Sequence, residues 1–225
     1  MDSAASEPSL AVPRADAPVD AARRGHPLAR RIGWIVVTVL SVLIGAYAVG
    51  VVATGFAIVP AEVTANHFPT ALGLRVHIVA SGVTLLVGPF QFLRPLRRRA
   101  PRVHHWMGRT YTLACLVGGL AGGSIAVFSA SGLVAGAGFF VVAICWLFCT
   151  VRAYLAVRAG DYVTHQRWMT RSFSLAFAAV MLRIYLPVSL IAGIEYADAY
   201  PVIAWACWVP NLIVAQFLVA SARGE

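Results

Sequence analysis

Two stretches of the chain carry histidine beside the same short motif. Residues 104–111 read HHWMGRTY, and residues 165–171 read HQRWMTR. Imidazole nitrogens suit iron and other transition metals, so two histidines on facing helices could ligate one heme iron or one metal ion. We therefore expect His104 and His165 to be candidate ligands of a metal or of heme b.

Arginines accompany both histidines. Arg109 and Arg171 each follow the tryptophan of their motif by three residues, and the two motifs are expected to begin helices. Helix N-termini that carry arginines attract anions. The anions could be the propionates of a heme or the phosphates of anionic lipids, and the residues alone favour neither.

A second polar set lies in an otherwise apolar segment near residue 80. Its members recur at helical spacing and share one helix face, which should point into the protein interior. They are His77, Ser81, Thr84, Gly88 and Gln91. His77 is either a hydrogen-bonded interior histidine or a ligand-binding or proton-transfer group.

Arg183 is the one arginine deep inside an apolar segment. An arginine within a membrane is energetically costly and is normally paired. Its partner could be Glu195, Asp198 or a bound anion, and a purely structural ion pair is the competing interpretation. We expect His77 and Arg183 to mark a quinone or proton site at the outer side of the membrane.

The elements that position these residues are apolar helices. Of the 225 residues, 60% are hydrophobic and 12% are charged, whereas soluble domains carry about 25% charged residues. A run of about 20 apolar residues crosses the hydrocarbon core of a bilayer. The sequence predicts an all-α integral membrane bundle with six spans, near residues 32–56, 70–93, 107–129, 133–155, 168–192 and 201–221.

The distribution of charge predicts the orientation. The chain has no lysine, and every arginine except Arg75 and Arg183 lies in a terminal tail, between spans two and three, or between spans four and five. This is the positive-inside pattern, so both termini should be cytoplasmic, in a bacterial inner membrane. The net charge of +9 then reflects topology and contact with anionic lipid rather than binding of nucleic acid.

Residues 1–30 lack an apolar period and are expected to form a disordered cytoplasmic tail before a membrane domain over residues 31–222. The four cysteines all fall inside spans, where they are best explained as packing residues. No paired carboxylates and no nucleophile motif occur in a span, so the sequence shows no apparatus for hydrolysis.

The chain also contains an internal match. Trp168 follows Trp106 by 62 residues, and Trp208 follows Trp146 by the same number. We interpret spans three–four and five–six as two copies of one helical hairpin, related by an axis along the membrane normal. This repeat would place Arg109 and Arg171 at matching depth.

These motifs together resemble a bacterial family of predicted membrane proteins, called domain of unknown function two-three-zero-six. The resemblance covers roughly residues 65–220. It is carried by LRVHIVASG at 74–82, GPFQF at 88–92, the two histidine motifs, Leu182-Arg183, and WACWVPN at 205–211. It marks His104 and His165 as the family histidines and His105 as a variant. The layout is more distantly similar to diheme cytochrome b and ferric-reductase bundles, although only one pair of histidines suits a heme.

Three functions are compatible with these residues. The first is a heme- or quinone-linked redox protein, with His104 and His165 as ligands and Arg109 and Arg171 on the propionates. The second is a module that handles lipid, anion or solute without catalysis. The third is a structural partner subunit whose polar residues only fix helix packing.

Overall fold

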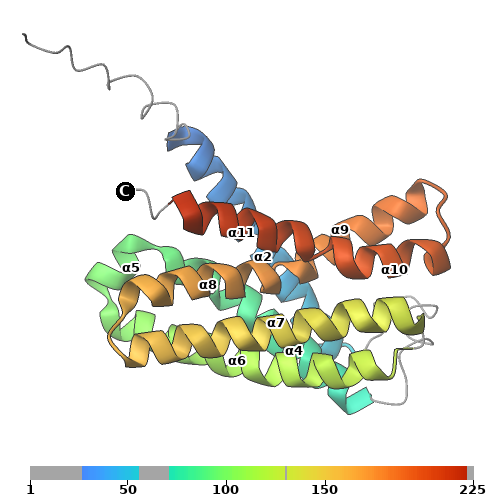
Figure 1. The fold of residues 1–225 in the computed structure, drawn as a ribbon, viewed down its shortest axis with the longest axis horizontal. Coiled ribbons are helices and arrows are strands. Elements are labelled where there is room, and N and C mark those ends of the chain that lie inside the picture. Colours follow the sequence, from blue (N-terminus) through green and yellow to red (C-terminus); the bar gives the residue numbers. More distant parts are fainter. Residues whose placement is uncertain (1–26, 56–70, 130, 222–225) are drawn as a thin grey trace, which may run out of the picture. The chain divides into compact units, whose positions relative to one another are not determined.

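The structure is a computed structural model that describes residues 27–55, 71–129 and 131–221. Every regular element in these ranges is a helix, and none is a strand. The chain divides into two units, residues 1–36 and residues 37–225. The first contributes the start of the first described helix, and the second contains all candidate functional residues (Figure 1).

Six helical segments are long and apolar enough to cross a membrane, which confirms the predicted all-α membrane fold. Their starts and ends differ from the predicted spans by a few residues. The helices are α2 (Pro27–Ala53), α4 (Ala71–Val87), α6 (Pro101–Val127), α7 (Gly132–Arg158), α8 (Tyr162–Ala176) with α9 (Ala178–Ile191), and α10 (Tyr196–Ala206) with α11 (Val209–Ser221). A 3-10 turn, η1 (Pro89–Phe92), and the short α5 (Arg94–Arg99) follow α4.

The predicted tail and the first helix overlap. Helix α2 begins at Pro27, so residues 27–30 are helical rather than part of a disordered tail. Residues 1–26 lie outside the described part of the chain, as do residues 222–225 at the other terminus.

The third and fifth segments begin a few residues before the predicted spans, at residues that favour a helix start. Pro101 stands in the first turn of α6, where its missing N–H is not needed. Asp161 caps α8, because its carboxylate accepts a hydrogen bond from the backbone N–H of Thr164 at 2.9 Å. Gly160, with φ of +77°, makes the preceding turn in a conformation that favours glycine.

The fifth and sixth segments are each interrupted, which differs from the single continuous helices that we expected. The fifth breaks at Phe177, between α8 and α9. The sixth breaks at Cys207 and Trp208, just before Pro210. A proline lacks the N–H that would bond the carbonyl one turn earlier, and its ring clashes with that carbonyl. Because of the break at Phe177, His165 of α8 and Arg183 of α9 do not lie on one continuous helix.

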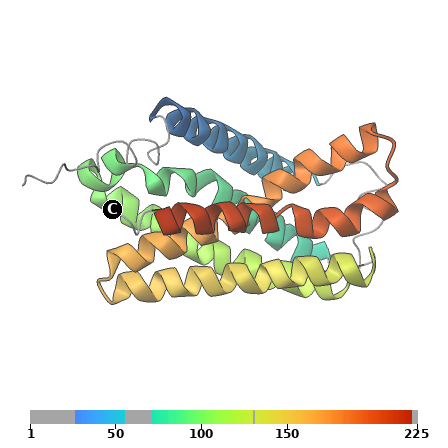
Figure 2. The ribbon, with the colours of Figure 1, turned by 45° about the horizontal axis from the view of Figure 1, so that its top comes forward.

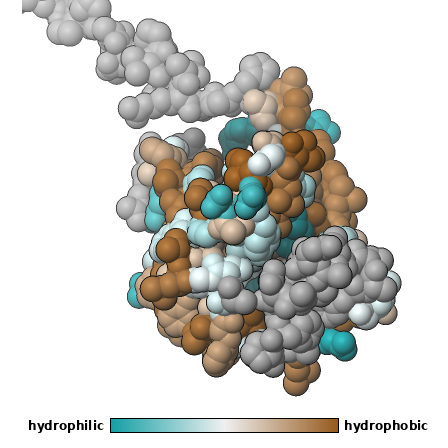
Figure 3. Space-filling view, turned by 90° about the vertical axis from the view of Figure 1, so that its right-hand side faces the viewer, coloured by the Kyte–Doolittle hydropathy of each residue, from teal (hydrophilic) through white to brown (hydrophobic). Residues whose placement is uncertain are grey.

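Four helices of the second unit form its core. Helix α4 packs on α6, α6 on α7, and α7 on α8, while α10 packs on α7 and α11 on α8 (Figures 1 and 2). We call the end with residues 93–100 and 159–161 the arginine-rich end. The end with residues 128, 129, 131 and 192–195 is the opposite end. Figure 3 views the opposite end, where hydrophilic side chains lie among hydrophobic ones.

Glycines bring α4, α6 and α7 close together. A Cβ added to Gly118 would lie 3.3 Å from Ala80 of α4, and one added to Gly119 would lie 2.8 Å from a side-chain carbon of Leu147 of α7. Close approach at small residues is the usual way in which membrane helices gain packing contacts. The glycine pattern of the third span therefore serves helix packing on two sides.

The residues of the proposed repeat share some environments and differ in others. Tyr111 and Phe173, equivalent at the offset, are both buried, whereas Leu113 is 64% exposed and Leu175 is 3% exposed. Trp146 lies within the continuous α7, but its equivalent Trp208 lies at the break between α10 and α11. The repeat remains a prediction from the sequence.

Candidate functional site

His165 is held in a defined orientation at the arginine-rich end. Its Nδ1 lies 2.9 Å from the main-chain oxygen of Ala153 in α7. A carbonyl oxygen only accepts, so Nδ1–H is the donor, and in the neutral form of the ring the other nitrogen, Nε2, carries a lone pair. Such a backbone-anchored imidazole is the usual form of a histidine that ligates a metal through Nε2.

The start of α8 positions this histidine. The backbone N–H of His165 donates to the carbonyl of Asp161, the helix-capping residue, at 3.0 Å. Hydrogen bonds from Thr164 favour the ionised carboxylate and hold the pKa of Asp161 below its ordinary value. The capped first turn therefore places His165 one turn inside the helix.

His104 lies near His165 on α6 and is half-buried. Its Nδ1 is buried and has no hydrogen-bond partner among the described residues. Its charge interacts with those of His105, Arg97 and His165, so all three lie within electrostatic range. His104 and His165 therefore lie at the same end of the bundle, and every group in this electrostatic set is basic.

Arg109 and Arg171 make the same local contact in the two motifs. The guanidinium of Arg109 lies 5.2 Å from the ring centre of Trp106, and that of Arg171 lies 4.6 Å from the ring centre of Trp168. Stacking of a cation on an aromatic face at positions i and i+3 explains why tryptophan and arginine recur at this spacing.

The wider surroundings of these two arginines differ. Arg171 donates two hydrogen bonds to Oε1 of Gln216 in α11, at 3.0 and 2.8 Å. Arg109 is exposed, and the Trp106 beneath it is 68% exposed. Arg171 therefore joins α8 to α11, while Arg109 lies on the surface of α6.

A hydroxyl network occupies the middle of the bundle. The Tyr111 hydroxyl lies 3.0 Å from Ser172 Oγ, and Ser172 Oγ lies 2.8 Å from Thr150 Oγ1. These three side chains are fully buried and come from α6, α8 and α7. Thr84 of α4 lies 3.9 Å from the sulfur of Cys115, one turn from Tyr111. The network satisfies polar groups inside an apolar bundle and connects its four helices.

The predicted polar stripe of α4 does face the interior. Thr84 is fully buried, and Gln91 is 7% exposed. The Oγ of Ser81 and the Nε2 of Gln91 are buried without a hydrogen-bond partner among the described residues. This confirms the inward orientation inferred from the helical spacing.

His77 is anchored to α6 in the same manner as His165 to α7. Its Nδ1 lies 2.8 Å from the carbonyl oxygen of Gly118. The ring occupies the space beside Gly122, where an added Cβ would lie 2.6 Å from Nδ1. The packing and the hydrogen bond together fix the ring, and Nε2 has no hydrogen bond to any of the described residues.

Arg183 of α9 lies close enough to His77 for their charges to interact. One of its guanidinium N–H groups donates to the Ala179 carbonyl at 3.0 Å, and the guanidinium carbon lies 6.0 Å from the ring centre of Tyr47. Tyr200 of α10 is also within electrostatic range. Within the described residues, no ion pair joins Arg183 to Glu195 or Asp198.

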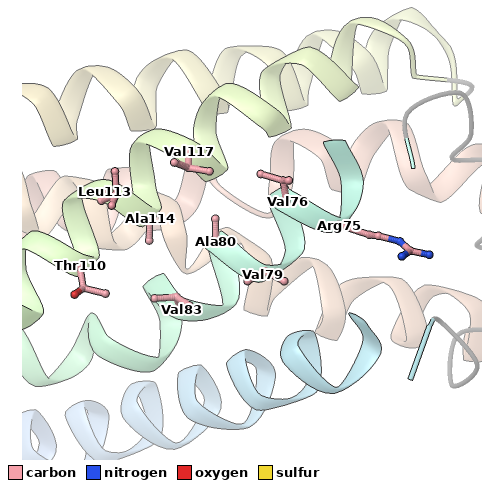
Figure 4. A pocket seen from close by; sticks show the side chains of 9 residues that line it. All are labelled: Arg75, Val76, Val79, Ala80, Val83, Thr110, Leu113, Ala114 and Val117. Atoms are coloured by element: carbon pink, nitrogen blue, oxygen red, sulfur yellow. The ribbon is translucent and has the colours of Figure 1, made fainter. Parts of the chain in front are cut away.

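None of the candidate site residues lines the groove that Figure 4 shows. That groove, of about 490 Å³, lies between α4 and α6 and is lined mainly by apolar side chains, with Arg75 among the lining residues. No group of three or more potential metal ligands occurs in the described ranges.

Residues 74–219 match the family described as Predicted membrane protein (DUF2306). The chain belongs to this family. The match spans α6 to α10 whole and contains all six candidate residues, so the DUF2306 region includes both polar sites. Comparisons with curated proteins and with solved structures find no match.

Some residues of the two DUF2306 sites have no signal of their own in the sequence. Arg97 is a charged neighbour of His104. In the sequence it belongs to a run of arginines that indicates only membrane topology. Tyr47 lies beside Arg183 and comes from a helix distant in sequence. Gly122 is one of several glycines in α6, and the structure places the His77 ring beside it.

Proposed function

We propose that this DUF2306 protein is a membrane redox protein that holds heme b between His104 and His165 and exchanges electrons with a membrane quinone. The observation that carries the proposal is the 2.9 Å contact between His165 Nδ1 and the Ala153 carbonyl. This contact leaves Nε2 of the neutral His165 ring with the lone pair that would ligate iron. The half-buried His104 lies within electrostatic range of His165.

The chemistry of this end suits heme better than a bare metal ion. The groups that interact with His104 are all basic, and a bare cation is not stabilised by such surroundings. Heme brings two carboxylate propionates as well as an iron that accepts imidazole ligands. Arg97 is the described arginine that interacts with His104, so it is the best candidate to pair with a propionate.

This assignment revises the expected roles of the motif arginines. Arg171 uses its guanidinium on Gln216 and on the carbonyl of Arg167, so its first role is to join helices. Arg109 lies over an exposed tryptophan. Under the proposal, Arg97 therefore takes precedence over Arg109 and Arg171 as the propionate partner, and a bound heme would supply one-electron chemistry.

The test is the visible spectrum of protein expressed with heme supply and purified in detergent. We expect a reduced-minus-oxidised spectrum of b type that is lost in His104→Ala and in His165→Ala. His105→Ala is the matched control, since His105 is adjacent but exposed. A colourless, well-folded wild-type protein would refute heme binding.

A second function, binding of an anionic lipid at the arginine-rich end, is favoured by the uniformly basic surroundings of His104. In that case Arg97→Gln would weaken binding to vesicles or nanodiscs that contain phosphatidylglycerol, and the protein would carry no heme. Binding of anionic lipid that is unchanged in Arg97→Gln would refute this alternative.

A further inference from the structure

The groove between α4 and α6 has a floor of small residues and walls of branched ones. Ala80 of α4 and Ala114 of α6 are buried at its floor. Gly118 lets the two helices approach closely, since a Cβ added there would lie 3.3 Å from the Cβ of Ala80. The wall residues, which are exposed or half-buried, are Val76, Val79, Val83, Leu113 and Val117. The result is an apolar hollow of about 490 Å³ on the outside of a packed helix pair.

The groove lies within the membrane-spanning part of both helices. Its residues 75–83 and 110–117 fall inside the spans Leu72–Phe92 and Pro101–Val127. Residues 75–83 rise about 12 Å along α4, while one leaflet contributes roughly 15 Å to the hydrocarbon core of a bilayer. A transmembrane helix of a partner or of a second copy would need a face along the whole span. The length of the groove therefore favours one acyl chain of one leaflet over a protein helix.

Arg75 is the charged residue of the groove. It is exposed and lies near the start of α4, toward the opposite end of the bundle. Figure 4 shows its side chain extending away from the valines. An arginine near the end of a span reaches the headgroup layer while its stem covers apolar surface. Its planar guanidinium has five N–H donors and suits two-point binding of a phosphate, even beside another partner. The charge of the groove is therefore complementary to that of a lipid phosphate.

We propose that this groove binds one anionic phospholipid from the leaflet at the opposite end. The phosphate accepts hydrogen bonds from Arg75, and one acyl chain lies along Val76, Val79 and Val83. A zwitterionic lipid such as phosphatidylcholine has the same chains and phosphate, but its quaternary ammonium is repelled by the guanidinium. The groove should therefore prefer an anionic lipid. This site is distinct from the arginine-rich end and requires neither heme nor quinone.

The experiment uses the full chain in lipid nanodiscs and two probes, phosphatidylglycerol and phosphatidylcholine, each with a photoreactive diazirine in the acyl chain. After irradiation, mass spectrometry of peptides locates the labelled residues. The reference is Val188 and Ile191, exposed apolar residues of α9 toward the same end. We expect the phosphatidylglycerol probe to label the groove about fivefold more than the phosphatidylcholine probe, and both to label α9 equally. Equal labelling of the groove by the two probes would overturn the proposal.

Variants of Arg75 test the headgroup contact. Arg75→Gln removes the charge at an exposed position, so it should abolish the preference for phosphatidylglycerol at an unchanged thermal midpoint. Arg75→Lys keeps the charge and should retain part of the preference. Arg102→Gln, which alters an exposed arginine at the start of α6, is the matched control and should retain the preference in full. A preference that survives in Arg75→Gln would overturn the assignment of the phosphate to Arg75.

A second pair of variants tests the seat of the acyl chain. Val79→Trp adds an indole at an exposed wall of the groove, whereas Leu120→Trp adds one at an exposed residue of α6 that does not line it. We expect Val79→Trp to reduce labelling of Val83 and Val117 by both probes, and Leu120→Trp to leave it unchanged. A folded Val79→Trp protein that is labelled like wild type would overturn the groove as the seat of the chain. If Val79→Trp fails to fold, the two probes and the Arg75 variants still decide the question.

Discussion

The ring of His77 occupies the space that a side chain on Gly122 would fill. A Cβ at Gly122 would lie 2.6 Å from Nδ1 and 2.8 Å from Cε1 of the imidazole. The same ring is bonded to the Gly118 carbonyl one turn away. The glycines of α6 thus serve two purposes, since they bring helices together and also seat a histidine from the neighbouring helix.

This relationship predicts that Gly122→Ala is destabilising. The imidazole is held by its hydrogen bond and must shift to make room, and overpacking of this kind costs about 1–3 kcal/mol. Gly123→Ala is the matched control, because its Cβ would lie 3.5 Å from Ala143, an ordinary contact. Thermal unfolding in detergent should show a lower midpoint for Gly122→Ala alone. Equal midpoints for the two variants would mean that the ring moves without cost.

The central hydroxyls predict energetic coupling between helices. Tyr111→Phe and Ser172→Ala each remove one partner of a fully buried hydrogen bond and should cost about 1–3 kcal/mol. The double variant should cost less than the sum, because both changes remove the same bond. Ser124→Ala, at an exposed serine of α6, should have little effect. Unfolding free energies that simply add would show that the bond contributes nothing.

The two motif arginines should differ in their importance for stability. Arg171→Ala removes two hydrogen bonds to Gln216 and a stacking contact, and we expect a loss of about 1 kcal/mol or more. Arg109→Ala removes stacking on an exposed tryptophan, which is worth roughly 0.5–1 kcal/mol at most. The order would be reversed if Arg109 were the residue that joins helices. Thermal midpoints of the two variants, measured in one detergent, decide between these outcomes.

The helix cap at Asp161 predicts a dependence on pH. Its pKa is lowered in the folded protein by hydrogen bonds from Thr164, so the cap stabilises the fold above the unfolded pKa of about 3.9. That stabilisation is lost as pH falls through the lower folded pKa. Asp161→Ala should therefore be less stable than wild type near pH 7. The difference in stability should shrink as the pH falls below the unfolded pKa of about 3.9 and through the lower folded pKa.

Asp161→Asn is the control for the cap, because asparagine accepts the same hydrogen bond without titrating. The contribution of its cap should not change with pH. A difference between wild type and Asp161→Ala that is constant from neutral to acidic pH would show that the carboxylate does not titrate with the cap.

The sequence alone determined the membrane class, the six spans and the inward-facing polar stripe of α4. These features depend on local composition and on helical periodicity, which hold wherever an apolar helix packs in a bundle. The interruption at Phe177 could not be read in the same way, because no proline marks it. The break near Pro210 did have a local signal, the proline itself. That proline lies within a long apolar run, which indicates one continuous span.

The pairing of residues across helices was decided only by the tertiary structure. His104 and His165 were identified from their motifs, but the Ala153 carbonyl that orients His165 could not be, since every helical residue offers a similar carbonyl. Tyr47 likewise acquires its role from Arg183, which is far along the chain. Residue types and spacing specify which face of a helix is polar, whereas helix packing and the break in the fifth segment determine which polar groups meet.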